Sequence, residues 1–280
     1  MAELKKPTYQ VTGKSFTAVA INTAAKAGEW IKSKLGDISA IDQKTSSRDL
    51  VTEVDKGAEK MIRNLIHTHF PTHAILGEEG VEPGPEASIQ ALQDLSESEF
   101  LWIVDPVDGT TNYIHGFPFF CVSLALAHKG EVIVGVVYDP VRDELFVAEK
   151  GKGAYMKGKR ISVSSEQTLS ESLVATGFPG GPGMLERNIA QMLYLVPRVR
   201  NIRTSGSAAL HLAYVAAGRL SAFWEMNLNS WDIAAGALLI QEAGGRVTDI
   251  DGKPFDLSVR HIVAANKHIH DELHTALAQA

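Results

Sequence analysis

Residues 103–111 read IVDPVDGTT, and this stretch decides how the rest of the chain is interpreted. A short apolar run ends here in two carboxylates, Asp105 and Asp108, which are followed by a glycine and two threonines. Asp-Pro and Asp-Gly pairs are common in turns, because aspartate bonds its own backbone and glycine tolerates a positive φ. A turn alone would explain the stretch, so other parts of the chain must decide whether its carboxylates have a chemical role.

The composition is typical of a globular enzyme. The chain has 280 residues, of which 45% are hydrophobic and 21% charged, and its net charge is −6. An acidic chain is not typical of nucleic-acid-binding proteins, which usually carry a basic face. The single cysteine, Cys121, allows no intramolecular disulfide, so we expect a cytoplasmic, reducing location. The N-terminal residues lack the apolar core of a signal peptide, and the longest aliphatic run, residues 233–240, is too short to span a membrane.

Hydrophobic periodicity predicts alternating helices and strands. Apolar residues at helical spacing indicate helices over residues 16–35 and 54–69. The acidic segment 81–99, which contains two prolines and a glycine, is predicted to be a long surface loop. Further helices are expected near residues 184–197, 207–217 and 231–243 and from 268, and strands near 74–76, 100–104, 172–177, 200–204, 219–225, 246–250 and 261–265, with a strand meander over 119–163. We therefore expect an α/β (α+β) protein with helices layered on mostly antiparallel sheets. Residues 1–280 are expected to form one domain with two halves, roughly 1–165 and 166–280.

Four places in the chain carry acidic residues at the end of a predicted strand or the start of a predicted helix. They are Glu78, the pair Asp105 and Asp108, Asp232, and Asp55. Taken singly, Asp55 and Asp232 are explained as acids that stabilise a helix N-terminus, by about 0.3–1 kcal/mol. Together, the first four acids supply the oxygen ligands that hard divalent cations need in a two-metal site. Without cations, such clustered carboxylates would repel one another.

The residues after Asp108 add a candidate phosphate site. If a helix begins at Gly109, its free N–H groups face the carboxylates and can bind an anion such as phosphate. Glycine lets the backbone approach a ligand closely, and the Thr110 hydroxyl can orient a nucleophilic water. The Val107 carbonyl lies between the two acids in the chain and offers a further oxygen ligand.

Two longer segments resemble the signature regions of the inositol monophosphatase family, whose members are magnesium-dependent, lithium-sensitive phosphatases. They are WIVDPVDGTTNYIHGFP at residues 102–118 and WDIAAGALLIQEAGG at residues 231–245. Shorter segments follow in the family's order: DLVTEVD at 49–55, GEE at 77–79, GKGAYMKGKRI at 151–161 and RTSGSAAL at 203–210. The resemblance spans nearly the whole chain and implies an αβαβα sandwich.

The resemblance also implies roles for particular residues. The implied ligands of two or three Mg²⁺ ions are Glu78, Asp105, the Val107 carbonyl, Asp108 and Asp232. Glu78 and Thr110 are implied to activate the nucleophilic water, and Asp55 is expected near a third ion or its waters. The implied substrate contacts are Gly109, Thr110, Ser207, Ala208, Glu225 and Asp232. Among these, Glu225 matches the acid that bonds inositol hydroxyls.

Three residues depart from common members of the family at the expected rim of the substrate site. Gly80, Ser207 and Asn229 stand where other members carry Ser, Thr and, in some animal members, His. The glycine-rich loop at 177–183 has no assigned role.

The predicted activity is Mg²⁺-dependent hydrolysis of a small phosphate monoester by direct attack of water, with myo-inositol monophosphate as the expected substrate. Alternative substrates are fructose 1,6-bisphosphate, NADP, histidinol phosphate and 3′-phosphoadenosine phosphates. An alternative of another class is a non-catalytic regulatory or binding protein that retains the fold. We expect a homodimer that acts on a phosphorylated polyol or sugar and binds neither nucleic acid nor membranes.

Overall fold

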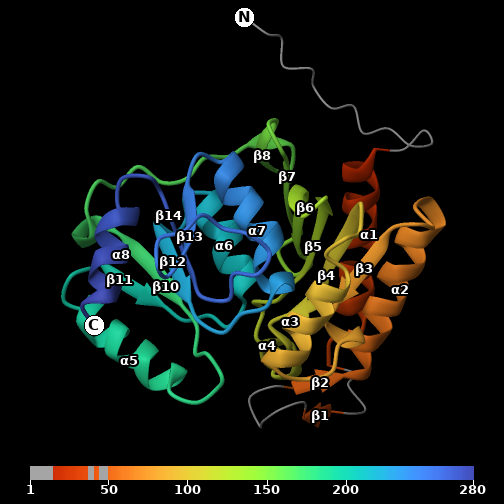
Figure 1. Ribbon diagram of the computed structural model, residues 1–280, viewed down its shortest axis with the longest axis horizontal. Helices are drawn as coiled ribbons and strands as arrows, with labels where there is room; N and C mark the ends of the chain where they lie inside the picture. Colours follow the sequence, from red (N-terminus) through yellow and green to blue (C-terminus); the bar gives the residue numbers. More distant parts are fainter. Residues whose placement is uncertain (1–14, 37–40, 44–49) are drawn as a thin grey trace, which may run out of the picture.

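The computed structural model describes residues 15–36, 41–43 and 50–280, which stack in five layers (Figure 1). Two helices cover one face of a seven-stranded sheet, a central helix pair separates this sheet from a five-stranded sheet, and a third pair covers the far face. These pairs are α1 (Phe16–Ser33) with α2 (Glu53–His69), α6 (Ala208–Ala216) with α7 (Ser230–Glu242), and α5 (Met184–Leu195) with α8 (His270–Ala278). The expected αβαβα sandwich is confirmed.

The seven-stranded sheet has the order β3-β4-β5-β6-β7-β8-β9, and only its first pairing is parallel. Its strands are β3 (Ala74–Gly77), β4 (Phe100–Asp108), β5 (Cys121–His128), β6 (Glu131–Asp139), β7 (Glu144–Glu149), β8 (Gly153–Met156) and β9 (Lys159–Arg160). Strands β5 to β9 follow one another as neighbours in the sheet, so the predicted meander is confirmed.

The five-stranded sheet has the order β11-β10-β12-β14-β13. Its strands are β10 (Leu173–Thr176), β11 (Asn201–Arg203), β12 (Ala222–Glu225), β13 (Arg246–Asp249) and β14 (Ile262–Ala265). Strand β10 is parallel to both of its neighbours, whereas β14 is antiparallel to both of its own. A separate antiparallel pair joins β1 (Ile41–Gln43) to β2 (Leu50–Thr52). Antiparallel pairings predominate among the described strands, as expected.

Strand β4 explains why the apolar run before Asp105 does not alternate with polar residues. Trp102 and Val104 pack with α1 and α2, whereas Leu101 and Ile103 pack into the central core with α6 and α7. Successive side chains of a strand point to opposite faces of its sheet. Because helices cover both faces, both sets of side chains are apolar.

The structure corrects two predictions. Residues 81–99 are not one long loop, because they contain the helix α3 (Pro85–Asp94). Pro85 occupies the first helical turn, where a missing N–H costs nothing, so a residue type that is common in loops starts a helix here. Strand β4 does not end at residue 104 but continues to Asp108, with a register shift against β5 between Asp105 and Asp108.

None of the helices in the described part of the chain combines the length and the apolarity that a membrane crossing requires. The described residues form three apolar cores, which fill the spaces between the layers. The organisation in a single domain stays a prediction.

Candidate active site

Three carboxylates from two distant parts of the sequence meet beside the end of β4. Asp105, Asp108 and Asp232 each offer one oxygen atom, and these three atoms lie within 4.8 Å of one another. The strand β4 delivers the first two acids, and the first turn of α7 delivers the third. Oxygen atoms at such separations can hold a hard divalent cation.

Asp108 is fixed by the start of α6. Its Oδ2 atom accepts hydrogen bonds from the Ser207 hydroxyl at 2.6 Å and from the Ala209 backbone N–H at 2.7 Å. Ser207 is also the N-cap of α6, since its hydroxyl accepts a bond from the Leu210 N–H at 3.3 Å. Removal from water raises the pKa of Asp108, the two hydrogen bonds lower it, and the charge of Glu78 raises it again.

Asp232 lies at the third position of α7 and closes a capping box. Its Oδ2 accepts a bond from the Asn229 N–H at 2.6 Å. Loss of hydration raises the pKa of Asp232 well above its usual value of 3.8, and the charges of Glu78 and Asp108 add to the effect. The structural role that the sequence suggested for this acid is therefore real, and it coexists with membership of the acidic group.

Glu78 lies in a short 3₁₀ turn, η1 (Glu78–Gly80), directly after β3. It is not part of the 4.8 Å group that the described residues form, but its charge raises the pKa values of Asp108 and Asp232. Strand β3 is parallel to β4, so both strands lead their acids toward the same edge of the sheet.

Asp55 connects the start of α2 to the start of α4 (Thr110–Ile114). Its Oδ2 accepts bonds from the Thr52 N–H at 2.9 Å and the Thr52 hydroxyl at 2.5 Å. Its Oδ1 lies 2.9 Å from the Thr110 hydroxyl, which also lies 3.0 Å from the Val107 carbonyl. Burial is the largest influence on Asp55 and raises its pKa.

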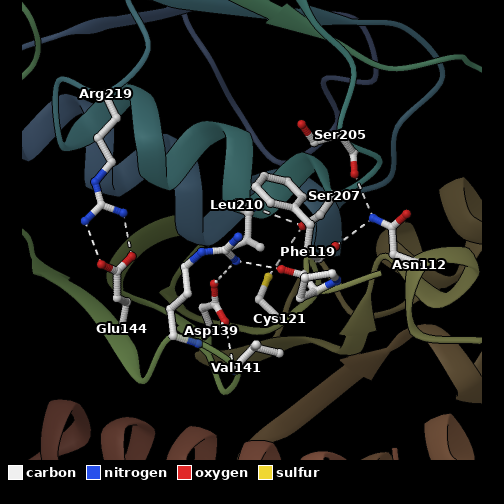
Figure 2. Close-up of polar contacts among 12 residues, drawn as sticks. Asn112, Phe119, Cys121, Asp139, Val141, Glu144, Ser205, Ser207, Leu210 and Arg219 are labelled. Atoms are coloured by element: carbon white, nitrogen blue, oxygen red, sulfur yellow. Dashed lines mark hydrogen bonds and ion pairs between the residues drawn. The ribbon is translucent and has the colours of Figure 1, made fainter. Parts of the chain in front are cut away.

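The predicted helix after Gly109 is present but has only five residues. Gly109 has a left-handed backbone with φ of +96°, and a Cβ atom there would lie 3.0 Å from the Phe119 carbonyl. Both facts favour glycine at this position. Asn112 of this helix donates from Nδ2 to the carbonyls of Phe119 and Ser205, each at 2.7 Å, and so joins two loops that flank the site (Figure 2).

Cys121 is a buried core residue, as expected, and it lies next to the acidic group. Its Sγ atom is 3.8 Å from Asp108 Oδ2 and 3.8 Å from the Ser207 hydroxyl, the contact that is visible in Figure 2. Burial, with the charges of Asp108 and Asp105, raises the pKa of this thiol well above its usual value. A thiol that stays protonated is a poor nucleophile.

A cavity of about 530 Å³ opens beside the acids. Glu78 and Asp232 line one part of it. The remaining lining comes from residues 81–85 and Ser88, from residues 178 and 180–182, and from Asn227, Asn229, Trp231 and Arg260. The glycine-rich loop, which had no assigned role in the sequence, is therefore a wall of this cavity.

Glu225 lies at the end of β12 and is not among the residues that line this cavity. Its carboxylate fills the space in which a side chain at Gly177 would begin. Loss of hydration raises the pKa of Glu225 well above its usual value, with smaller contributions from the charges of Asp232 and Asp108. Glu225 thus lies within electrostatic reach of the acidic group.

Arg260 is a residue of the cavity that the sequence did not reveal. Strands β12 and β14 are antiparallel, with Glu225 opposite Ile262, and continuing this register by two residues brings Asn227 beside Arg260. The Arg260 Nη2 atom donates to Asn227 Oδ1 at 3.0 Å. Because this pairing depends on strand register, no local sequence signal could have identified Arg260.

Comparison with known proteins assigns the family. The sequence pattern of the inositol monophosphatase family matches residues 13–280. The chain is 44% identical to "Inositol monophosphatase 2" of Solanum lycopersicum, over 95% of this chain and 98% of that protein. It is also 44% identical to "Nus factor SuhB" of Pseudomonas aeruginosa, over 89% and 90% of the two chains.

A solved structure agrees with the fold. The crystal structure of the extragenic suppressor protein suhB from Bartonella henselae superimposes with a TM-score of 0.85 at 40% identity. The match covers 94% of this chain and 98% of that one.

A layered α/β fold with an acidic group that can hold a metal ion agrees with a metal-dependent phosphatase, the class to which the matching family belongs. The chain belongs to the inositol monophosphatase family and is a phosphoric monoester hydrolase. The predicted family and reaction class are confirmed.

Proposed function

We propose that the protein hydrolyses a small phosphorylated polyol or sugar, with Mg²⁺ held by Glu78, Asp105, Asp108, Asp232 and the Val107 carbonyl. The observation that carries the proposal is the convergence of three carboxylate oxygens within 4.8 Å of one another beside the start of α4. Myo-inositol monophosphate is the proposed substrate, because a relative that is 44% identical to this chain is named an inositol monophosphatase.

The donor set fits Mg²⁺. All proposed ligand atoms are oxygens, which hard cations prefer, and no thiolate or imidazole is included. The raised pKa values of Asp108 and Asp232 express the cost of holding neighbouring negative charges out of water. Positive charge at this position would remove that cost. When bound, Mg²⁺ would lower the pKa of a water molecule and stabilise negative charge on phosphate oxygens.

The side chains would orient the nucleophilic water and move its proton. A hydroxyl has one proton to donate and two lone pairs to accept with. If Thr110 donates to Asp55, to which it lies at 2.9 Å, its oxygen is free to accept a hydrogen bond from the water. Asp55, whose pKa is raised by burial, and Glu78 would then be the two carboxylates that can hold the released proton.

The remaining residues would bind the substrate. We propose that the backbone of Gly109 and Thr110 binds the phosphate, together with the first residues of α6, Ser207 and Ala208. In this structure the Ser207 hydroxyl donates a hydrogen bond to Asp108. Ser207 would therefore act on phosphate binding indirectly, by holding the Asp108 carboxylate in place. Glu225, with Asp232, would accept hydrogen bonds from hydroxyls of the substrate.

Activity in chelator tests the proposal. Dialysis against a chelator should abolish phosphate release from inositol monophosphate, and added Mg²⁺ should restore it. Full turnover without metal would contradict the proposed site. A panel of the alternative phosphate esters, assayed at saturating Mg²⁺, would identify the preferred substrate. The homodimer and the cytoplasmic location stay predictions.

A further inference from the structure

We propose that Arg260 binds a second phosphate group of the substrate, separate from the phosphate that is hydrolysed. The inference rests on the proposed function and deepens it, because it adds a binding site for a second phosphate to the site that cleaves a phosphate monoester. It concerns the wall of the cavity that lies beyond the acidic group.

The Arg260 guanidinium is held by neutral oxygens alone. Its Nη1 donates to Ser88 Oγ at 2.8 Å and to Asn229 Oδ1 at 2.6 Å, and its Nη2 donates to Asn227 Oδ1. Among the described residues, no carboxylate oxygen lies close enough to the Arg260 guanidinium, within 4.0 Å, to form an ion pair. The side chain is half-buried, and burial lowers the pKa of its guanidinium. An arginine stays protonated in proteins, so this charge is partly removed from water, and the charge of Asp232 acts on it without a direct ion pair.

Two of its donors have no partner among the described residues. A guanidinium has five N–H groups, and the three bonds above use both on Nη1 and one on Nη2. The two that are left belong to Nε and Nη2, which are adjacent nitrogens. Nε and Nη2 lie on one edge of the guanidinium, and N–H groups on such an edge can bind two oxygens of a phosphate.

Arg260 also lies in the right place. It lines the same cavity of about 530 Å³ as Glu78 and Asp232, and it is the only basic residue among the described residues that line it. Cavities that bind small ligands commonly have volumes of 300–1,000 Å³. One phosphate would lie at the acids with their cations, and the other would reach the guanidinium.

The glycine-rich loop supports this arrangement. Asn227, which accepts from Arg260 through Oδ1, donates from Nδ2 to the Gly180 carbonyl at 3.1 Å. Asn227 has a left-handed backbone with φ of +59°, which asparagine tolerates better than most residues. One amide therefore fixes both the guanidinium and the loop that forms part of the cavity wall.

The competing explanation is structural, because the three bonds also join α3 to the segment before α7. A pair of substrates that differ only in the second phosphate separates the two explanations. Fructose 1-phosphate and fructose 1,6-bisphosphate share the phosphate at C1, and the appearance of fructose 6-phosphate shows that this group is released. The wild-type protein should have the higher kcat/KM for the bisphosphate.

Arg260→Gln should lower the ratio of kcat/KM for the bisphosphate to kcat/KM for the monophosphate by about tenfold to a hundredfold. This is the range for the loss of a hydrogen bond to a charged group. Arg260→Lys keeps the charge but loses the paired donors, so the ratio should fall by a smaller factor. Arg187→Gln is the matched control: Arg187 is exposed, acts electrostatically on the neighbouring His261 and does not line the cavity. It should leave the ratio at the wild-type value.

Equal losses on both substrates, or no preference for the bisphosphate in the wild type, would overturn the inference. If the wild type hydrolyses neither compound with Mg²⁺, its turnover of inositol monophosphate decides the proposed function, and the two compounds then serve as stable ligands in calorimetry. Tighter binding of the bisphosphate that disappears in Arg260→Gln would still support the second phosphate site, and equal binding of the two would refute it.

Discussion

Asp232 serves the end of a helix and the acidic group with the same carboxylate. Its Oδ2 accepts the Asn229 N–H, and its charge lies near those of Glu78 and Asp108. The folded state therefore gains a cap and loses stability to repulsion and lost hydration. Because the pKa of Asp232 is raised, the folded protein binds this proton more tightly than the unfolded chain does. Stability from this group consequently falls as the pH rises above 3.8 toward the raised pKa.

We predict that Asp232→Asn abolishes phosphatase activity and raises the melting temperature in chelator at pH 7. Asparagine keeps an oxygen that can accept the Asn229 N–H while it removes the charge. The gain should shrink at pH 4.5, because the raised pKa favours the protonated wild-type carboxyl as the pH falls. Thermal melts of both proteins at the two pH values measure this. Asp232→Ala, which removes the cap as well, should be less stable than Asp232→Asn by about 1 kcal/mol. A large drop in melting temperature for Asp232→Asn would show that the cap outweighs the repulsion.

At the scale of elements, helix α2 determines the position of the turn that carries Glu78. Glu59 of α2 is buried, and its Oε2 accepts the Glu79 backbone N–H at 2.7 Å. Its Oε1 binds Arg63 Nε at 2.7 Å, and Arg63 donates to the Ile75 carbonyl at 3.2 Å. A Cβ atom at Gly77 would lie 2.5 Å from the Glu59 carboxyl group, so glycine makes room for this contact. Glu59 and Arg63 together hold the chain on both sides of Glu78, at Glu79 and at Ile75.

We predict that Glu59→Gln raises the Mg²⁺ concentration for half-maximal activity by about tenfold to a hundredfold, the usual effect of losing a residue that orients a ligand. The value of kcat at saturating Mg²⁺ should change much less, because Glu59 does not touch the reacting groups. A Mg²⁺ titration of activity measures both. The exposed α3 residue Glu86 supplies the control, since Glu86→Gln should titrate like the wild type. A proportional loss of kcat with an unchanged Mg²⁺ dependence would exclude a positioning role.

The sequence predicted most elements because their hydrophobic periods are long. Helix α1 was expected at 16–35 and spans Phe16–Ser33, and the strands of the meander were found where turns separate them. The sequence does not predict helix α3, because Pro85 and its neighbours resemble a loop, and it does not predict the end of β4, because Asp-Pro resembles a turn. Both errors arise at residues that are common in two kinds of structure, so that only the surrounding fold decides between a turn and a helix or strand.

The sequence predicts the acidic residues of the candidate site but not the residues that form the walls of its cavity. Asp105 and Asp108 are close in sequence, and the recurrence of acids at element ends suggested that Asp232 joins them. Arg260 and Asn227 depend on the register between β12 and β14, which a sequence does not specify. The contacts of Ser207 with Asp108 likewise depend on the packing of α6 against the end of β4.

At the scale of the whole molecule, the central layer joins the two sheets, and a histidine is buried in it. His211 of α6 lies between the rings of Phe119 and Phe223, whose centroids are 5.3 and 5.2 Å from its own. Its Nε2 accepts the Ser205 N–H at 3.2 Å, and its Nδ1 has no partner among the described residues. Burial lowers the pKa of His211 to about 4. Protonation would place a second donor against the Ser205 N–H and a charge in the core.

This histidine should make the fold sensitive to acid. Between pH 6.5 and 4 the unfolded chain binds a proton at this position that the folded protein does not, so the stability contributed here falls as the pH falls. We predict that the wild type loses about 3 kcal/mol more than His211→Phe when the pH is lowered from 7 to 4. Urea denaturation in chelator at a series of pH values measures the difference, and the titration of the carboxylates cancels in the comparison. Phenylalanine keeps the ring contacts but loses the bond to Ser205, which costs about 1 kcal/mol at every pH.

His115→Asn, at an exposed histidine, should follow the wild-type curve. Parallel curves for the wild type and His211→Phe would show that His211 is protonated in the folded protein as readily as in the unfolded chain.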